Sequence, residues 1–529
     1  MAELNSKPCL VQTAQGFSVT YKEKLLYSKY NPQKNIRSII ENTTILPGTI
    51  ILCLSPVLEY GLEELYKKCP ENCIAFGIEK DADLYELSKN SNSDKAYAKS
   101  GFFNLVQPEN VNTLPSLFEK LCQKGEYRRV IRMDFSGGAQ FYRDFYNELF
   151  IALQNTVNQF WKNRVTLVKF GRKYSSNILK NLKYFPKSIR DLKTDKAIIV
   201  AGAGESAINT LKSIKADREK YFIIAVDVLL KTLKALDMKA DAVICEEAQN
   251  IIIKAFTGCK KQFDYLFLSS TVNPICSRIA PEKNIFYTPL FANLVFLERL
   301  TNYGIVTGTQ APLGSVGLSA VETALKIRKS EDIPVFVTGL DFSYSKGKTH
   351  AVNSLHDFIR RKKSNYLCGA PENWGASFEN STTKTRGKDG KEVFTTAILN
   401  SYAELFNFRF NRIKNLFDAG STGLKLDIPQ KLPCSNYGSS IEIEKFSEDY
   451  EQKINSFISE EIKALNELKT LFTTKTTLSQ EEKNKKIQSL LEEREYLYLH
   501  FPDGTKASLS QDFLNRVRTE LDYFLKKLR

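Results

Sequence analysis

Short apolar runs alternate with stretches of helical periodicity through the middle of this chain. The runs stand at 197–201, 222–226, 242–245, 265–268, 284–287 and 334–339. After the first two runs, apolar residues recur at helical spacing. Strands that alternate with helices are typical of a parallel sheet covered by helices. The pattern therefore predicts an α/β domain with a mostly parallel, Rossmann-like sheet.

Glycine and polar residues directly follow the first three runs. Gly202, Gly204 and Ser206 follow the first run, Asp227 follows the second, and Glu246 follows the third. The carboxyl ends of parallel strands share one edge of a sheet, and ligands of open α/β sheets bind there. Glycines permit positive φ and the close approach of a ligand, and the next helix N-terminus attracts an anion. We expect a nucleotide site here, with a tight structural turn as the alternative.

A second α/β pattern precedes the first. Its apolar runs lie at 49–54, 73–78 and 129–133. Glu79 follows the second of these runs, at a position where an acid could bind a nucleotide. The loop at 55–61 has lost the glycines that would let a backbone cradle phosphate, and Pro56 removes an N–H donor. We expect a degenerate, non-catalytic α/β domain.

The end of the chain has helical periodicity, with Ser479 and Glu482 spaced as a capping box. A length of 529 residues is too great for one ordinary core. We expect three parts, which are the degenerate domain at 1–160, the central domain at 161–435 and a helical region at 436–529. Residues 379–393 lack an apolar pattern, which predicts a mobile loop near the site or a surface excursion.

Charge and composition narrow the class of protein. The net charge is +15, but the lysines are spread along the chain and no nucleic-acid motif accompanies them. We therefore expect a solvated lysine surface and no nucleic-acid partner. No apolar run approaches the roughly 20 residues that span a bilayer, and the N-terminus has no apolar signal segment. Ten cysteines are scattered without a framework, which predicts reduced thiols in the cytoplasm and no metal site.

Histidine is scarce, and His350 stands out because it follows the apolar run that ends at Gly339. A histidine is suited to taking a proton from a hydroxyl nucleophile at neutral pH. Tyr344 or a nearby lysine could neutralise a phosphate leaving group. The alternatives are that His350 only caps a loop, or that Asp341 or Glu246 is the base.

Four blocks of sequence carry a resemblance to a known family. In order, they are AIIVAGAGESA, FIIAVDVLLKTL, GSVGLSAVETAL and GLDFSYSKGKTHA. They resemble the core of the motility-associated-factor (Maf) glycosyltransferases, which is also similar to bacterial sialyltransferases and to an archaeal pterin pyrophosphokinase. The segments LLYSKYNP and FDAGSTGLKLDIP look like the outer parts of the family. The resemblance therefore covers most of the chain.

The resemblance implies a central Rossmann-like, GT-A-like domain that transfers a nonulosonic acid from a CMP-sugar to serine or threonine of flagellin, with no required cofactor or metal. By resemblance, the nucleotide-binding residues are Gly202, Gly204, Ser206, Asp227, Glu246, Gly314, Ser315 and Gly339. The catalytic residues are Asp341, Tyr344 and His350. Glu205 and Glu246 depart from the family's usual residues, which leaves the donor sugar open. The rival functions are a pterin pyrophosphokinase that uses ATP and a non-catalytic scaffold that binds flagellin.

Overall fold

The computed structural model describes residues 7–89, 96–121, 127–292, 294–306, 308–367, 369, 372–434, 437–473 and 478–528. The chain folds into two compact units. The first consists of Met1–Lys169 and Leu499–Ala507, and the second of Phe170–Tyr498 and Ser508–Arg529. This division differs from the three parts expected from the sequence, because the helical residues beyond 436 belong largely to the second unit.

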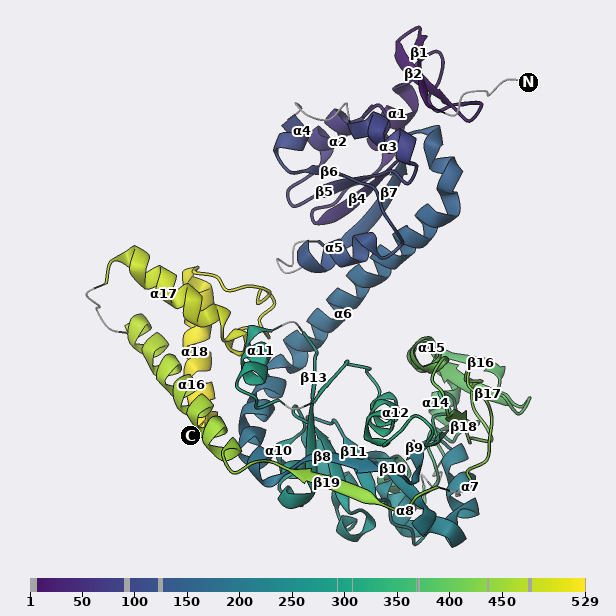
Figure 1. The fold of residues 1–529 in the computed structure, drawn as a ribbon, viewed down its shortest axis with the longest axis vertical. Coiled ribbons are helices and arrows are strands. Elements are labelled where there is room, and N and C mark those ends of the chain that lie inside the picture. Colours follow the sequence, from purple (N-terminus) through teal and green to yellow (C-terminus); the bar gives the residue numbers. More distant parts are fainter. Residues whose placement is uncertain are drawn as a thin grey trace. The chain divides into compact units, whose positions relative to one another are not determined.

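The first unit is built on a parallel four-stranded sheet with the order β6-β5-β4-β7 (Figure 1). Its strands are β4 (Thr49–Leu54), β5 (Ile74–Ile78), β6 (Phe103–Val106) and β7 (Arg129–Asp134). Its helices are α1 (Lys34–Asn42), α2 (Leu62–Lys68), α3 (Ala82–Lys89), α4 (Ala96–Lys99), α5 (Thr113–Leu121) and the first part of α6 (Arg143–Asn181). A small antiparallel sheet precedes them, with β1 (Cys9–Thr13), β2 (Gly16–Tyr21) and β3 (Lys24–Leu25).

The carboxyl edge of this first sheet is filled by the chain's own side chains. Glu79 is fully buried and accepts hydrogen bonds from the hydroxyls of Ser55, at 2.5 Å, and Tyr146, at 3.2 Å. Burial raises the pKa of Glu79 to about 7. Ser55 and Glu59 adopt left-handed φ values of 51° and 58°, although neither is glycine. The position expected for a nucleotide-binding acid is therefore a packed interior position, which agrees with a degenerate domain.

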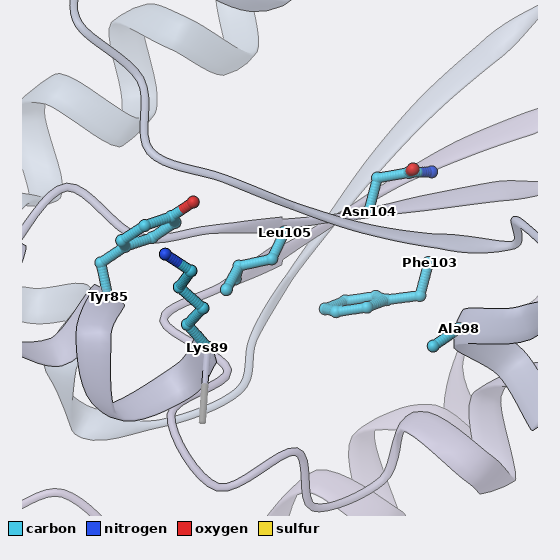
Figure 2. A pocket seen from close by; sticks show the side chains of 6 residues that line it. All are labelled: Tyr85, Lys89, Ala98, Phe103, Asn104 and Leu105. Carbon is cyan, nitrogen blue, oxygen red and sulfur yellow. The ribbon is translucent and has the colours of Figure 1, made fainter. Parts of the chain in front are cut away.

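A hollow of about 320 Å³ lies elsewhere in this unit, beside the edge strand β6. Figure 2 shows Tyr85 and Lys89 of α3 next to each other and the ring of Phe103 turned toward Ala98 of α4. Its lining contains none of the four residues discussed above at the carboxyl edge.

The second unit contains the large sheet predicted from the sequence, with the order β18-β15-β9-β10-β11-β12-β13-β8-β19. Its strands are β8 (Ile189–Thr194), β9 (Ala197–Ala201), β10 (Tyr221–Val226), β11 (Ala242–Cys245), β12 (Tyr265–Ser269), β13 (Asn284–Pro289), β14 (Thr309–Gln310), β15 (Val335–Thr338), β18 (Leu416–Asp418) and β19 (Ile441–Lys445). Neighbouring strands are parallel except for β19, which runs antiparallel to β8. The predicted parallel α/β core is thus confirmed.

Helices flank this sheet, and α12 (Val316–Ile327) packs across β8, β9, β10, β11 and β15. The others are α7 (Ser206–Ser213), α8 (Leu230–Ala235), α9 (Ile253–Phe256), α10 (Pro274–Ser277), α11 (Val295–Asn302), α13 (Leu355–Lys363), α14 (Trp374–Phe378) and α15 (Ala397–Phe410). Because strands β10 to β13 extend to one side of β9 while β15 and β18 extend to the other, the sheet reverses its order between β9 and β15. Ligands of open α/β sheets bind at such a reversal.

Residues 379–393, expected to be a mobile loop or a surface excursion, contain regular structure. Strands β16 (Thr382–Arg386) and β17 (Glu392–Thr396) pair as an antiparallel hairpin. The hairpin turn carries Lys388, whose side chain is only 4% exposed. The pattern of apolar residues did not reveal this hairpin, because the side chain buried at its turn is a charged lysine.

The C-terminal helices are α16 (Tyr450–Thr473), α17 (Gln480–Glu492) and α18 (Gln511–Leu528). The predicted capping box of Ser479 and Glu482 is confirmed at the start of α17. The buried carboxylate of Glu461 on α16 pairs with Arg299 of α11, at 2.6 Å. This ion pair fixes the C-terminal helices to the second unit. No helix among the residues described above is both long enough and apolar enough to cross a membrane.

Candidate functional site

The glycine loop after β9 packs directly against the loop after β15. The N–H of Gly202 donates to the carbonyl of Thr338 at 2.8 Å, and the N–H of Gly204 donates to that of Gly339 at 2.9 Å. A Cβ at Gly202 would lie 2.3 Å from the Gly339 oxygen. The expected positive φ is not found at either loop glycine, whereas Gly339 has a φ of 69°. Gly202 and Gly204 are thus required for the close approach of two loops at the point where the sheet reverses.

Asp341 and Ser206, two predicted site residues, bind each other at the N-terminus of α7. The backbone N–H of Ser206 donates to Oδ2 of Asp341 at 3.0 Å, and the Ser206 hydroxyl donates to Oδ1. Asp341 is 5% exposed and Ser206 is 1% exposed. Burial raises the pKa of Asp341 to about 6, and the hydrogen bonds from Ser206 act in the opposite direction. A helix N-terminus favours an anion. Here the protein's own carboxylate occupies the place where the sequence predicts a phosphate.

Sequence reasoning missed a buried ion pair beside this position. Nζ of Lys388 lies 2.5 Å from Oδ2 of Asp418, and the two side chains are 4% and 3% exposed. The positive charge of Lys388 also lowers the pKa of Asp341. A Cβ at Gly420 would lie 2.8 Å from Oγ of Ser206 and 3.0 Å from Nζ of Lys388, so both side chains border this glycine. Asp418 stands at the end of an apolar strand, in the same way that Asp227 directly follows one. This position in the sequence is the signal that could have identified Asp418.

Glu205 is directed toward the loop that follows β15. Its carboxylate accepts a hydrogen bond from the hydroxyl of Ser345, and Nζ of Lys348 lies 3.9 Å away. An acid next to a phosphate-binding loop is unfavourable unless it has other partners. Glu205 has such partners, so its departure from the family pattern has a local physical explanation.

Two further predicted acids lie at the carboxyl ends of β10 and β11. Asp227 is 4% exposed, and burial raises its pKa to about 6. Glu246 is half-buried and accepts a hydrogen bond from the hydroxyl of Tyr287 at 2.8 Å. Burial raises the pKa of Glu246, while hydrogen bonds from Ser319 and Tyr287 lower it. Glu246 is therefore the less buried of these two residues.

Gly314 and Ser315 form the turn that opens α12. Gly314 is exposed and has a φ of 70°, which favours glycine. Ser315 is the N-cap, but its side chain makes no capping hydrogen bond. Ser319 stands four residues later, and residues at this spacing share a helix face. Because Ser319 lies close enough to Glu246 to lower its pKa, the first turn of α12 lies on the side of the carboxyl end of β11.

Tyr344 is packed into the base of the hairpin. Its backbone pairs with Phe394, and the two rings stack. Its hydroxyl donates to the carbonyl of Ala376 at 2.7 Å. A phosphate leaving group would have to compete with this hydrogen bond, so the predicted role of Tyr344 as a leaving-group donor gains no support from its contacts.

His350 is joined to the glycine loop through its neighbour. The N–H of Ala351 donates to the carbonyl of Ala203 at 2.8 Å. The half-buried imidazole stacks on His356, with ring centroids 4.2 Å apart, and its Nδ1 lies 3.1 Å from the hydroxyl of Thr349. Burial, then the charges of His356 and Arg360, lower the pKa of His350 to about 4. The imidazole is therefore neutral at pH 7, and its low pKa makes it a weaker proton acceptor than an ordinary histidine.

The segment beyond His350 also reaches the neighbouring strand end. The hydroxyl of Thr232 on α8 donates to the carbonyl of Val352 at 3.0 Å. Helix α13 packs against the turn at Asp227–Leu229. The structure thus brings the glycine loop, Asp227, Asp341 and the His350 segment to one edge. Within the described ranges, no three His, Cys, Asp or Glu side chains gather as metal ligands do.

Comparisons with known proteins agree on the family of this chain. A family model described as 6-hydroxymethylpterin diphosphokinase MptE-like matches residues 176–347. An uncharacterized protein of Treponema pallidum (strain Nichols) is 30% identical over 568 residues, which cover 98% of this chain and 95% of the relative. The solved structure of a Maf glycosyltransferase from Magnetospirillum magneticum AMB-1 is similar with a TM-score of 0.56 and 13% identity, over 99% of this chain and 91% of that one. The chain therefore belongs to the Maf/MptE-like family.

Proposed function

We propose that this chain is a glycosyltransferase that moves a nonulosonic acid from a CMP-sugar to serine or threonine hydroxyls of flagellin in the cytoplasm, in support of flagellar assembly and motility. The observation that carries the proposal is the meeting of the predicted residues at one edge of the sheet. Asp341 is bonded to Ser206, and the residue after His350 is bonded to the glycine loop. The similarity in fold to a solved Maf glycosyltransferase supports glycosyl transfer as the reaction class.

The nucleotide is proposed to lie on the α12 side of this edge. The N–H groups of Gly202, Gly204 and Ser206 already donate to carbonyl or carboxylate oxygens of the protein. By contrast, the side chain of Ser315 makes no capping hydrogen bond, and the exposed Gly314 beside it can approach a phosphate closely. In this proposal the glycine loop is the scaffold of the site, and Gly314 and Ser315 contact the phosphate.

Transfer is proposed to proceed by direct displacement with inversion. The acceptor oxygen forms a bond to the anomeric carbon, the bond from that carbon to the CMP phosphate oxygen breaks, and the acceptor proton passes to the imidazole of His350. CMP leaves with the electron pair, and protein donors stabilise its phosphate charge. If His350 is the base, transfer falls as the pH drops through its pKa of about 4. Glu246 is the alternative base, since Asp341 is buried beneath Ser206.

The test uses the purified full chain with CMP-pseudaminic acid and recombinant flagellin, and intact-mass measurement of the flagellin. The proposal expects a mass increase of one sugar residue per modified site, and a matching loss of modification in cells that lack the gene. Calorimetry with CMP, CTP and ATP should show binding of CMP. Absence of both CMP binding and flagellin modification would overturn the proposal.

Two variants separate the proposed phosphate contact from the scaffold. Ser315→Ala should weaken CMP binding and leave the unfolding midpoint unchanged, since its side chain makes no capping bond. Ser206→Ala should lower the midpoint, because it removes a hydroxyl that bonds to both Asp341 and Gly339. If Ser206→Ala weakens CMP binding and Ser315→Ala does not, the phosphate contact is assigned to the loop before α7 instead.

A pterin pyrophosphokinase is the second candidate, because the matching family model bears that description over residues 176–347. This function would use ATP and magnesium and would transfer a diphosphate to 6-hydroxymethylpterin. Incubation with both substrates and detection of AMP distinguishes it, since glycosyl transfer releases CMP instead.

A further inference from the structure

An exposed aromatic surface begins a few residues beyond His350. Isolated exposed apolar side chains are ordinary, but several within one short segment mark an interaction site. Here they occur on α13, on α14 and between these helices. Their exposed fractions are 38% for Phe358, 102% for Tyr366, 90% for Leu367, 43% for Trp374 and 66% for Phe378. We call this set, together with the basic residues beside it, the aromatic rim.

The aromatic rim is positively charged. The last turn of α13 carries Arg360, Arg361, Lys362 and Lys363, and Glu372 is the one acid between residues 358 and 378. Nζ of Lys346 lies 5.7 Å from the ring centre of Trp374 and 5.4 Å from that of Phe378, so another ammonium stands among the exposed rings. Of these cations, Arg361 has an acidic partner, Asp357, at 3.0 Å. From the start of α13 to the end of α14 the net charge is +2, from four basic and two acidic residues, which favours an acidic partner.

Hydrogen bonds join the aromatic rim to the candidate site. The N–H of Asn373 donates to the carbonyl of Gly347 at 2.6 Å, and the N–H of Gly347 donates to the hydroxyl of Ser377 at 3.0 Å. Gly347 lies in the loop between Asp341 and His350, so α14 rests directly on the loop that leads to the proposed base. A polymer bound along the rim would pass beside His350.

We propose that the aromatic rim binds the acceptor polypeptide as an acidic segment with apolar side chains. This inference rests on the proposed function, which requires a protein acceptor at this edge. The exposed Tyr, Trp and Arg side chains are the types that carry most binding energy in protein interfaces. Leu367 offers aliphatic surface, which suits an apolar side chain of a polypeptide better than a nucleic-acid backbone. The modest charge of the segment also fits a peptide better than a polyanion such as RNA.

The first experiment measures binding without any transfer reaction. The probe is a fluorescein-labelled glutamate–tyrosine copolymer, and its anisotropy is followed with the full chain at increasing salt. The paired substitution Tyr366→Ser with Leu367→Ser should weaken binding at least about tenfold, as expected for hot-spot side chains. Both side chains are almost fully exposed, so the fold should be retained.

A charge reversal with a matched control tests the electrostatic part. Lys362→Glu with Lys363→Glu should weaken copolymer binding about three- to tenfold and flatten its salt dependence, since exposed charges contribute modestly. The control is Lys260→Glu with Lys261→Glu. This exposed lysine pair precedes β12 and therefore lies at the opposite, amino edge of the same sheet. The control should leave binding unchanged.

The outcomes distinguish this proposal from the proposed function. With flagellin, the rim variants should raise KM for the acceptor while kcat and CMP affinity stay unchanged. Copolymer binding that is unaffected by the rim variants, or is weakened equally by the control, would overturn the proposal. The proposal would also be overturned if the full chain bound single-stranded RNA more tightly than the copolymer and the rim variants lost that binding. The same holds if the wild-type chain self-associates and the rim variants are monomeric. Failure of sugar transfer alone would refute the proposed function and leave the copolymer result standing.

Discussion

Replacement of Lys388 by methionine should destabilise the second unit by about 3–4 kcal/mol, because it leaves a buried carboxylate without its partner. The Lys388 and Asp418 side chains are 4% and 3% exposed, and their charged atoms lie 2.5 Å apart. Methionine preserves most of the apolar stem, so little packing is lost. The loss measured should therefore come mainly from the charge of Asp418.

The buried group that remains in each single variant can become neutral by gaining or losing a proton. The free energy of that protonation change sets an upper limit on the loss of stability. At pH 7, protonating an ordinary aspartate costs about 4 kcal/mol, and deprotonating an ordinary lysine costs about 5 kcal/mol. The loss in Lys388→Met should therefore shrink as the pH falls. The loss in Asp418→Asn, which strands the ammonium, should shrink as the pH rises. The double variant removes both charges and should recover most of the stability.

The tryptophans allow each unit to be followed separately. Trp161 is in the first unit and Trp374 is in the second, and the sequence has no others. In a Trp161→Phe background, the fluorescence of Trp374 during urea unfolding reports on the second unit alone. Measurements at pH 5, 7 and 9 test the opposite pH trends. The reasoning is refuted if Lys388→Met leaves the midpoint unchanged, or if the double variant loses as much as the two single variants together.

Three further predictions test other parts of the molecule. Gly204→Ala should destabilise the second unit by about 1–3 kcal/mol, as overpacking does, since its Cβ would lie 2.4 Å from Oδ2 of Asp341; an unchanged urea midpoint would show that the two loops can separate. Glu79→Gln should stabilise the first unit above pH 7 by up to about 3 kcal/mol and have little effect near pH 4. The sign follows because burial raises the Glu79 pKa to about 7, so stability is lost as the pH rises toward that value; unfolding at both pH values checks it. His350→Ala should slow transfer about 10²–10⁴-fold without weakening CMP binding, as expected for the loss of a general base. Normal transfer by this variant would assign the base to a carboxylate. The control is His500→Ala in the first unit.

The sheet could be predicted because its strands are buried on both faces. Every residue of β9 and of β10 is buried, and such strands appear in a sequence as continuous apolar runs. The hairpin of β16 and β17 could not be predicted in this way. All residues of β16 are exposed or half-buried, and Lys388 at the turn is buried through an ion pair that hydrophobic patterning does not detect.

Part of the site followed from one topological rule. Because parallel strands end at a common edge, Ser206 and Asp341 could be assigned to one place although 135 residues separate them. Their roles could not be assigned in this way. Whether a helix N-terminus binds an external phosphate or an internal carboxylate depends on which side chain reaches it, and that depends on the path of the loop after β15.

The same geometry explains why the ligand is proposed beside the reversal of the sheet and not within it. A Cβ at Gly339 would lie 2.5 Å from the carbonyl oxygen of Gly202, so the loops after β9 and β15 leave no room between them. This contact closes the crevice that a doubly wound sheet normally offers to a nucleotide. The neighbouring carboxyl ends of β10 and β11 are not closed by this contact. Asp227 is buried there, and Glu246 is half-buried near the first turn of α12. The N-terminus of that helix offers N–H donors to an anion. The glycine signature thus marks the edge of the sheet where the site is proposed, while the phosphate contact is expected from the helix-opening turn at Ser315.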